Sequence, residues 1–190
     1  EDKLHQNMHV LVEGTSISKV SATKITAPEG AAVIDGGGKT LMPGYIDAHA
    51  HGPYGRDDII PQNNWSLLAH LALGVTTVHN PSSRAAQVFP AAEYQRAGKI
   101  IGPRIFSTGE IIYGAKSTGF DPIESLDDAK AVVDRLKAQG AISVKNYNQP
   151  RRAQRQMVIE AARDAGMLVV AEGGSPYNMD MNLVADGSTG

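Results

Sequence analysis

Residues 44–51 of the chain read GYIDAHAH, a short apolar, β-prone run that follows a Pro-Gly turn and ends in two histidines. Such a run predicts a buried strand over residues 45–48 with the histidines at its carboxyl end. Alternate side chains of a strand share one face, so His49 and His51 can point toward one ion. Neutral imidazole is a good ligand for zinc and other borderline divalent metals. Two unrelated surface histidines are the plainer interpretation of the triplet taken alone.

The glycines just before this stretch, in DGGGKT (residues 35–40), suggest a second chemistry, phosphate binding. A P-loop needs a glycine five residues before its Gly-Lys-Thr and a helix after it. The required position holds Val33, and Pro43 follows too soon for a regular helix. We therefore interpret the glycines as a tight turn.

Strand-like and helix-like segments alternate from this point onward. Strands are predicted at YIDA, VTTVHN, RIFSTG, ISVKNY and LVVAEG, and helices at NNWSLLAHLAL, AAQVFPAAEYQRAG, SLDDAKAVVDRLKAQG and PRRAQRQMVIEAARDAG. The third helix has the clearest signals, because Ser125 and Asp128 form a capping box and Gly140 ends it. Pro90 is expected to break or restart the second helix, and Pro150 to begin the fourth. This alternation predicts a parallel sheet.

The histidine-bearing stretch also resembles the first barrel strand of the amidohydrolase superfamily. In that superfamily a Pro-Gly, an apolar residue, an Asp and a His-x-His occur in the order found in GKTLMPGYIDAHAHG. The resemblance continues through LLAHLALGVTTVHNPSS, GPRIFSTGEIIYGA, ISVKNYNQPRRAQRQMVIEAARDAGMLVVAEGG and DGSTG, which together cover nearly all of the chain. These segments look like the amidohydrolase domain of TolB-propeller-fused, imidazolonepropionase-like or Xaa-Pro-dipeptidase-like members.

The expected fold is α/β, with two parts. Residues 1–43 contain the short alternating pieces HVLVEG, SISKVSA and AAVIDGGG, which predict small antiparallel strands and fit a small β-sandwich portion. Residues 44–190 are expected to form an incomplete (β/α)8 barrel of the TIM type with about five strands. Eight strands and ~250 residues are typical of such barrels. We therefore expect the chain to be a truncated, N-terminal part of a hydrolase barrel.

Polar side chains end each predicted strand, which is where (β/α) barrels place their active sites. By resemblance, the candidate metal ligands are His49, His51, Lys145 and Glu172. The candidates for lining a substrate pocket are His79, Glu110 and Asn146. Asp47 is assigned to supporting the site, and the general base, an Asp of the eighth strand in the family, is expected beyond the chain end.

Lys145 and Glu172 each leave an alternative open. In related amidohydrolases a lysine at the end of this strand is carboxylated and its carbamate bridges two metals. The other interpretation is a buried amine that pairs with Glu172 or another carboxylate at the barrel mouth, because an unpaired buried charge is costly. Glu172 stands where many family members have a histidine, and a carboxylate can also bind zinc or act structurally.

The resemblance implies a metal-dependent hydrolase that cleaves C–N bonds of a small amide, cyclic amide or dipeptide substrate with a metal-activated water. One or two divalent ions are expected, zinc first, with manganese, iron or nickel as alternatives. The competing hypothesis is a catalytically inactive half-barrel that acts as a structural or self-assembling module. Open sheet edges favour pairing, so a homo-oligomer or a complementary missing segment is expected in either case.

Composition narrows the function classes further. With 18 Lys and Arg against 20 Asp and Glu, and no basic stripe, nucleic acid is not an expected partner. The local cluster Arg151, Arg152 and Arg155 is interpreted as a solvated helix face. The chain has no cysteine, which excludes a disulfide framework and a thiolate metal site. No apolar run predicts a membrane span, and the charged start is not a signal peptide, so the localisation stays unknown.

Overall fold

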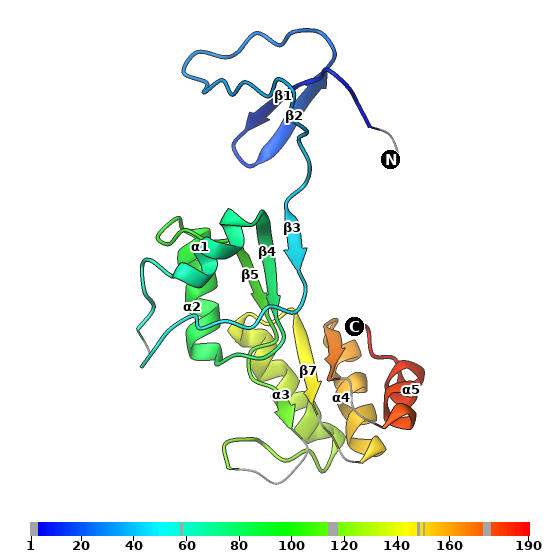
Figure 1. Cartoon of the computed structure of the whole chain (residues 1–190). Helices are drawn as coiled ribbons and strands as arrows, with labels where there is room; N and C mark the ends of the chain where they lie inside the picture. The colour runs from blue at the N-terminus through cyan, green and yellow to red at the C-terminus, as the bar shows by residue number, and fades with distance from the viewer. Residues whose placement is uncertain (1–3, 58, 114–117, 148, 150, 173–175) are drawn as a thin grey trace. The chain divides into compact units, whose positions relative to one another are not determined.

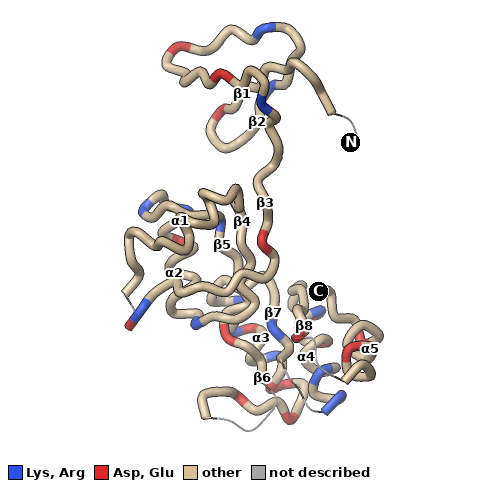
Figure 2. The backbone as a smooth tube through the Cα atoms, in the orientation of Figure 1, with Lys and Arg blue, Asp and Glu red and all other residues tan. Residues whose placement is uncertain are grey.

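The computed structural model describes residues 4–57, 59–113, 118–147, 149, 151–172 and 176–190 (Figure 1). The chain divides into two compact units, Glu1–Met42 and Pro43–Gly190. Figure 2 shows that basic and acidic residues are interspersed along both units rather than gathered by sign. Among the described residues, no helix combines the length and apolar character needed to cross a membrane.

The first unit contains one antiparallel hairpin, formed by β1 (His9–Glu13) and β2 (Ser16–Ser21). The third strand expected in this region, AAVIDGGG, is not found, and its Val33 and Ile34 are 80% and 89% exposed. The glycines form a turn instead, in which Asp35 accepts a hydrogen bond from the N–H of Gly37 at 2.9 Å. The tight-turn interpretation is confirmed, whereas the sandwich is not.

Within its described residues, the second unit contains two parallel three-stranded sheets. The first has the order β3 (Tyr45–Asp47), β4 (Val75–Asn80) and β5 (Arg104–Ser107). The second has the order β6 (Ile112–Tyr113), β7 (Ser143–Tyr147) and β8 (Leu168–Ala171). All the strands that were predicted in this unit are present, and β6 is an addition to them. The parallel α/β class is therefore confirmed, but a closed barrel is not formed by the described strands.

A close approach of the backbone explains the Pro-Gly turn before β3. A side-chain carbon placed on Gly44 would lie 2.1 Å from Oγ1 of Thr76, a residue of β4. Only glycine therefore lets the start of β3 lie against its neighbouring strand. The N–H of Tyr45 then donates to the carbonyl of Gly74 at 2.8 Å, which helps to place β3 beside β4.

Five helices accompany the described strands: α1 (Trp65–Ala72), α2 (Ala85–Arg96), α3 (Leu126–Gln139), α4 (Arg152–Asp164) and α5 (Tyr177–Asp186). The expected break at Pro90 is wrong, because α2 continues through it while Val88 and Ala91 stay fully buried. The capping box of α3 is confirmed, and so is its end at Gly140. The helix α4 begins at Arg152, and Pro150 lies outside the described residues. The sequence analysis did not predict α5.

The core consists of two apolar clusters on the helix-covered side of the sheets. One gathers residues of α2, β4 and β5, the other residues of α3, α4, β7 and β8, and Phe89 packs against both. Val144 of β7 belongs to the second cluster. Because side chains alternate along a strand, Ser143 and Lys145 face the opposite side of β7. That opposite side carries the candidate site.

Candidate metal centre

His49 and His51 lie just beyond the carboxyl end of β3, and both are exposed. Their Nε2 atoms face each other at 3.1 Å, with the ring planes inclined by 76°. Two imidazole nitrogens that bind one tetrahedral zinc at about 2.0 Å stand about 3.3 Å apart. The pair therefore has the separation required to share one ion.

Asp47 supports the turn that carries these histidines. Its Oδ1 accepts a hydrogen bond from the backbone N–H of His49 at 3.1 Å, and its Oδ2 lies 3.7 Å from Nε2 of His70. His70 belongs to α1, where its Nδ1 donates to the carbonyl of Ser66 at 2.8 Å. Asp47 thus connects the end of β3 to α1.

His79 of β4 connects this turn to β7. Its Nδ1 lies 3.2 Å from the carbonyl oxygen of Ala48, and its Nε2 lies 2.8 Å from Oγ of Ser143. A carbonyl oxygen only accepts, so Nδ1 carries the proton and Nε2 accepts from the serine hydroxyl. Burial lowers the pKa of His79, and the nearby positive groups of His49 and Lys145 lower it further, against an opposing effect of the Ala48 hydrogen bond. Both ring nitrogens of His79 are therefore engaged in the neutral state.

Lys145 lies on β7 with its side chain only 1% exposed, and its ammonium group forms an ion pair with the carboxylate of Glu172. Glu172 follows β8, and its side chain is 35% exposed. A protonated lysine has no lone pair for a metal. This ion pair is the contact described by the second interpretation of Lys145, and the carbamate stays a prediction.

Glu110 and Asn146 lie apart from the histidine pair. The Oε1 of Glu110 accepts from the N–H of Ala85 at 2.8 Å, so this carboxylate caps the start of α2. Asn146 is on the helix-covered side of β7, where its Nδ2 donates to the carbonyl of Arg155 at 3.3 Å. Neither of these hydrogen bonds involves another candidate residue.

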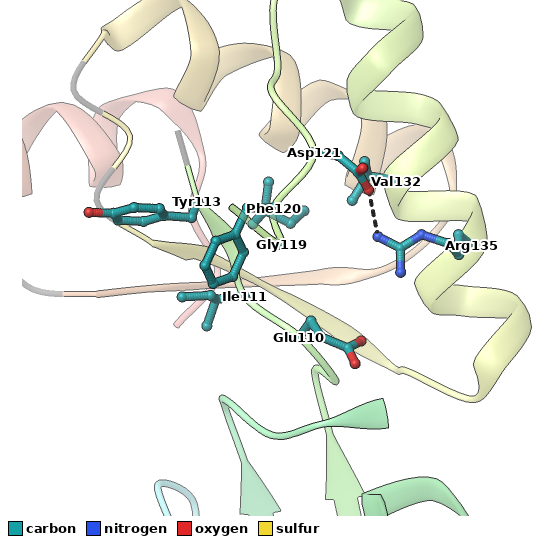
Figure 3. A pocket seen from close by; sticks show the side chains of 9 residues that line it. Glu110, Ile111, Tyr113, Gly119, Phe120, Asp121, Val132 and Arg135 are labelled. Carbon is teal, nitrogen blue, oxygen red and sulfur yellow. Dashed lines mark hydrogen bonds and ion pairs between the residues drawn. The ribbon is translucent and has the colours of Figure 1, made fainter. Parts of the chain in front are cut away.

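Glu110 does line a separate pocket of about 230 Å³ beside β6 and α3 (Figure 3). Tyr113 and Phe120 form its aromatic side, with ring centroids 5.3 Å apart. Arg135 and Asp121 form its polar side through an ion pair of 3.0 Å. The histidine pair is not among the residues that line this pocket.

The fit of these residues to a metal ion is partial. The imidazole pair has the right donors and separation, whereas Lys145 and Glu172 neutralise each other. Among the described residues, no group of three or more His, Cys, Asp or Glu side chains is arranged to hold an ion. His49 and His51 can bind an ion directly, whereas Lys145 and Glu172 can bind it only if their ion pair opens.

Sequence reasoning did not identify Ser143, although its position two residues before Lys145 places both on one face of β7. The role of the Ala48 carbonyl has no sequence signal, because any residue supplies that group. The solvated-face interpretation of the arginine cluster is wrong for Arg155. That side chain is only 5% exposed, and its guanidinium donates to the carbonyl of Gln149 at 2.6 Å.

Comparisons with known proteins agree with this architecture. No family model matches the chain. A curated dihydroorotase of Geobacter sulfurreducens is 26% identical over 189 residues, which cover 95% of this chain and 40% of that protein. A solved amidohydrolase is 22% identical with a TM-score of 0.75, covering 97% of this chain and 55% of the other. A Xaa-Pro dipeptidase with bound methionine in its active site is 19% identical with a TM-score of 0.65, covering 95% and 55%.

The chain thus has the fold of amidohydrolase-type proteins, and the resemblance drawn from its sequence is confirmed. The chain spans 40% of the dihydroorotase and 55% of each of the two structures.

Proposed function

We propose that the protein is a metal-dependent hydrolase that cleaves the C–N bond of a small amide, cyclic amide or dipeptide. The observation that carries this proposal is the 3.1 Å approach of Nε2 of His49 to Nε2 of His51 at the carboxyl end of a parallel strand. The dihydroorotase and dipeptidase among the similar proteins support a hydrolase of this class. The general base is not among the residues assigned.

His49 and His51 are proposed to hold one divalent ion, with zinc first among the choices because both donors are imidazoles. A divalent ion bound there would supply Lewis acidity, which activates water and polarises the scissile carbonyl. The exposure of both rings leaves the ion open to water and substrate. The backbone hydrogen bond to Asp47 keeps the first ligand at the end of β3.

Lys145 and Glu172 are proposed to join the ligand set when Lys145 is carboxylated. The ammonium first loses one proton to solvent. The neutral amine then adds to carbon dioxide, a bond forms between Nζ and the carbon while one C–O π bond opens, and a second proton leaves to solvent. The group then changes from a cation to an anion, so its attraction to Glu172 becomes repulsion. Opening of the ion pair would release oxygen ligands from both side chains.

Metal content tests the proposal. The full chain, purified without a chelator or a histidine tag, is expected to contain near-stoichiometric metal by inductively coupled plasma mass spectrometry. His49→Ala and His51→Ala should each lose most of the metal, because each substitution removes one of the two imidazoles that are proposed to bind it. His9→Ala is the matched control, since His9 belongs to the separate hairpin. Wild-type protein that stays free of metal after incubation with zinc and bicarbonate would contradict the proposal.

A second candidate function, a catalytically inactive self-assembling module, is favoured by the open edge of β3. Within the described residues, β3 pairs only with β4, whereas the backbone groups of Val169 on β8 already bond to Thr189 and Gly190. Unpaired edges of this kind can join another copy or a complementary segment. Turnover of amide and dipeptide substrates by metal-loaded protein separates the two functions, because the module would hydrolyse none of them.

A further inference from the structure

The peptide unit between Ala48 and His49 is held at both of its polar groups. Its carbonyl oxygen lies 3.2 Å from Nδ1 of His79, and its N–H donates to Oδ1 of Asp47 at 3.1 Å. A peptide unit is planar, so two hydrogen bonds on its opposite sides fix the rotation of the whole plane. That plane sets the direction in which the His49 side chain leaves the backbone.

His79 also contacts the turn beyond His49. Its backbone carbonyl accepts a hydrogen bond from the N–H of Ala50 at 2.9 Å. Ala50 lies between the two histidines and is only 5% exposed. The residues that carry the imidazole pair are therefore docked on His79 through both its side chain and its backbone.

The far side of the His79 ring is fixed by β7. Oγ of Ser143 lies 2.8 Å from Nε2, and Ser143 itself is only 1% exposed. The serine hydroxyl donates because Nδ1 already carries the ring proton. This arrangement selects one tautomer and one ring orientation. It also leaves His79 without a free lone pair for a metal or a free proton for a substrate.

We propose that His79, held as its Nδ1–H tautomer by Ser143, is a positioning residue that aims His49 and His51 at a shared divalent ion. The proposal rests on the proposed function and deepens it, because it assigns a role that a substrate-lining residue would not have. Burial keeps the pKa of His79 below its ordinary value, so the neutral ring persists at neutral pH. Loss of a group that bonds directly to a ligating side chain typically weakens metal affinity 10- to 100-fold, and we expect loss of the His79 bond to the backbone of the turn to fall at the low end of that range.

Two substitutions separate the two hydrogen bonds of His79. The amide nitrogen of His79→Asn can occupy the Nδ1 position and keep the bond to Ala48, while the bond to Ser143 is lost. The longer amide of His79→Gln reaches toward Ser143 instead and loses Ala48. Both variants remove the ring, so their comparison controls for lost packing. Zinc affinity of the full chain is measured by competition with a chromophoric chelator.

The expected result is that His79→Gln weakens zinc binding tenfold or more, whereas His79→Asn stays within about threefold of the wild type. Equal affinities in the two variants would overturn the proposal. Nitrogen-15 NMR of the imidazole provides a readout independent of metal, because it distinguishes Nδ1–H from Nε2–H. An Nε2–H tautomer in the wild type would also overturn the proposal.

If the wild type binds no zinc, that result counts against the proposed function. The inference about His79 is then tested by measurements that do not need a metal. Hydrogen exchange of the His49 amide then decides it. Protection of that amide should be kept in His79→Asn and lost in His79→Gln if His79 holds the peptide unit. Equal protection in both variants would show that His79 does not position the turn.

Discussion

Lys145 and Glu172 differ in how much each depends on the other. The Lys145 side chain is 1% exposed, whereas that of Glu172 is 35% exposed and can be hydrated. Removing one partner of an ion pair leaves an uncompensated charge, which is costly when that charge is buried and much less so when it is hydrated. The two positions should therefore respond unequally to the same substitution.

Glu172→Met is expected to lower the free energy of unfolding by about 3 kcal/mol, because it leaves a buried ammonium unpaired. Lys145→Met should change it by less than about 1 kcal/mol, because an apolar chain of similar length fills the same space. Urea denaturation of the two variants at pH 7 and without metal measures both values. Equal losses in the two variants would mean that the ammonium is not buried as the structure shows.

His79 should make stability depend on pH in a defined direction. Its pKa in the folded chain is lowered from the ordinary value of 6.5, chiefly by burial, so the unfolded chain binds more protons between the two values. Above about pH 7, the free energy of unfolding therefore does not change with pH through the titration of His79. It falls as the pH drops through 6.5 toward the folded-state pKa, by at most about 1.4 kcal/mol per pH unit for one proton.

Urea denaturation between pH 7.5 and 5 tests this dependence. His79→Asn should flatten the pH profile, because asparagine does not titrate. His9→Asn should keep the wild-type profile, because His9 lies in the other compact unit. A variant profile as steep as that of the wild type would assign the dependence to other groups.

Individual residues were predictable where their chemistry is local. The alternation in DAHAH predicted two imidazoles on one side of a buried strand. Their Nε2 atoms lie 3.1 Å apart, but both histidines follow β3, and the prediction that this strand is buried is wrong, because Tyr45 and Ile46 are exposed. The buried position of Lys145 and its possible partner Glu172 followed from an interrupted apolar run. Contacts that join distant strands were not predictable in this way. The bond from His79 to Ser143 spans 64 positions and depends on how β4 and β7 pack.

At the scale of elements, α3 shows how local chemistry determines a boundary. Oγ of Ser125 accepts from the N–H of Asp128 at 3.2 Å, and the Asp128 carboxylate accepts from the N–H of Ser125 at 2.9 Å. The other end closes at Gly140, which has a φ of 111°. Both signals lie within a few residues of the boundary, so the sequence alone predicts them.

Ser125→Ala is expected to lower the free energy of unfolding by about 1 kcal/mol, the usual cost of losing a helix cap. Thermal and urea unfolding followed by circular dichroism measure the change. Asp127→Asn is the matched control, because Asp127 lies in the same first turn but outside the box, and its effect should stay below about 0.5 kcal/mol. If Ser125→Ala and Asp127→Asn have equal effects, the capping box adds no stability beyond the effect of an acidic residue on the helix dipole.

Other boundaries depend on tertiary contacts and were missed. The segment RIFSTGEIIY contains two strands, because the chain turns aside at Gly109, which has a φ of 69°. Oγ of Ser107 accepts from the N–H of Gly109 and donates to the carbonyl of Asn80 on β4. The partner of that serine lies 27 positions away, so a local pattern does not reveal the break. The same holds for α2, which tolerates Pro90 because its neighbours are buried in the core.

At the scale of the whole molecule, the open edge of β3 is apolar. Tyr45 and Ile46 are 59% and 69% exposed, and within the described residues β3 has a neighbouring strand on one side only. Exposed, unpaired and apolar strand edges favour pairing between chains. A barrel-type sheet that is completed by another segment would cover these residues. The chain on its own is expected to cover them by association.

We therefore expect concentration-dependent self-association of the chain in sedimentation velocity and light scattering. Ile46→Lys should shift the distribution toward the monomer, because a charge on an edge strand opposes pairing. Ile101→Lys is the matched control, since Ile101 is 65% exposed but lies outside the strands, and it should leave association unchanged. A wild type that stays monomeric across the concentration range would show that the β3 edge does not pair. If Ile46→Lys and Ile101→Lys reduce association equally, then exposed apolar side chains in general cause the association, and the β3 edge does not.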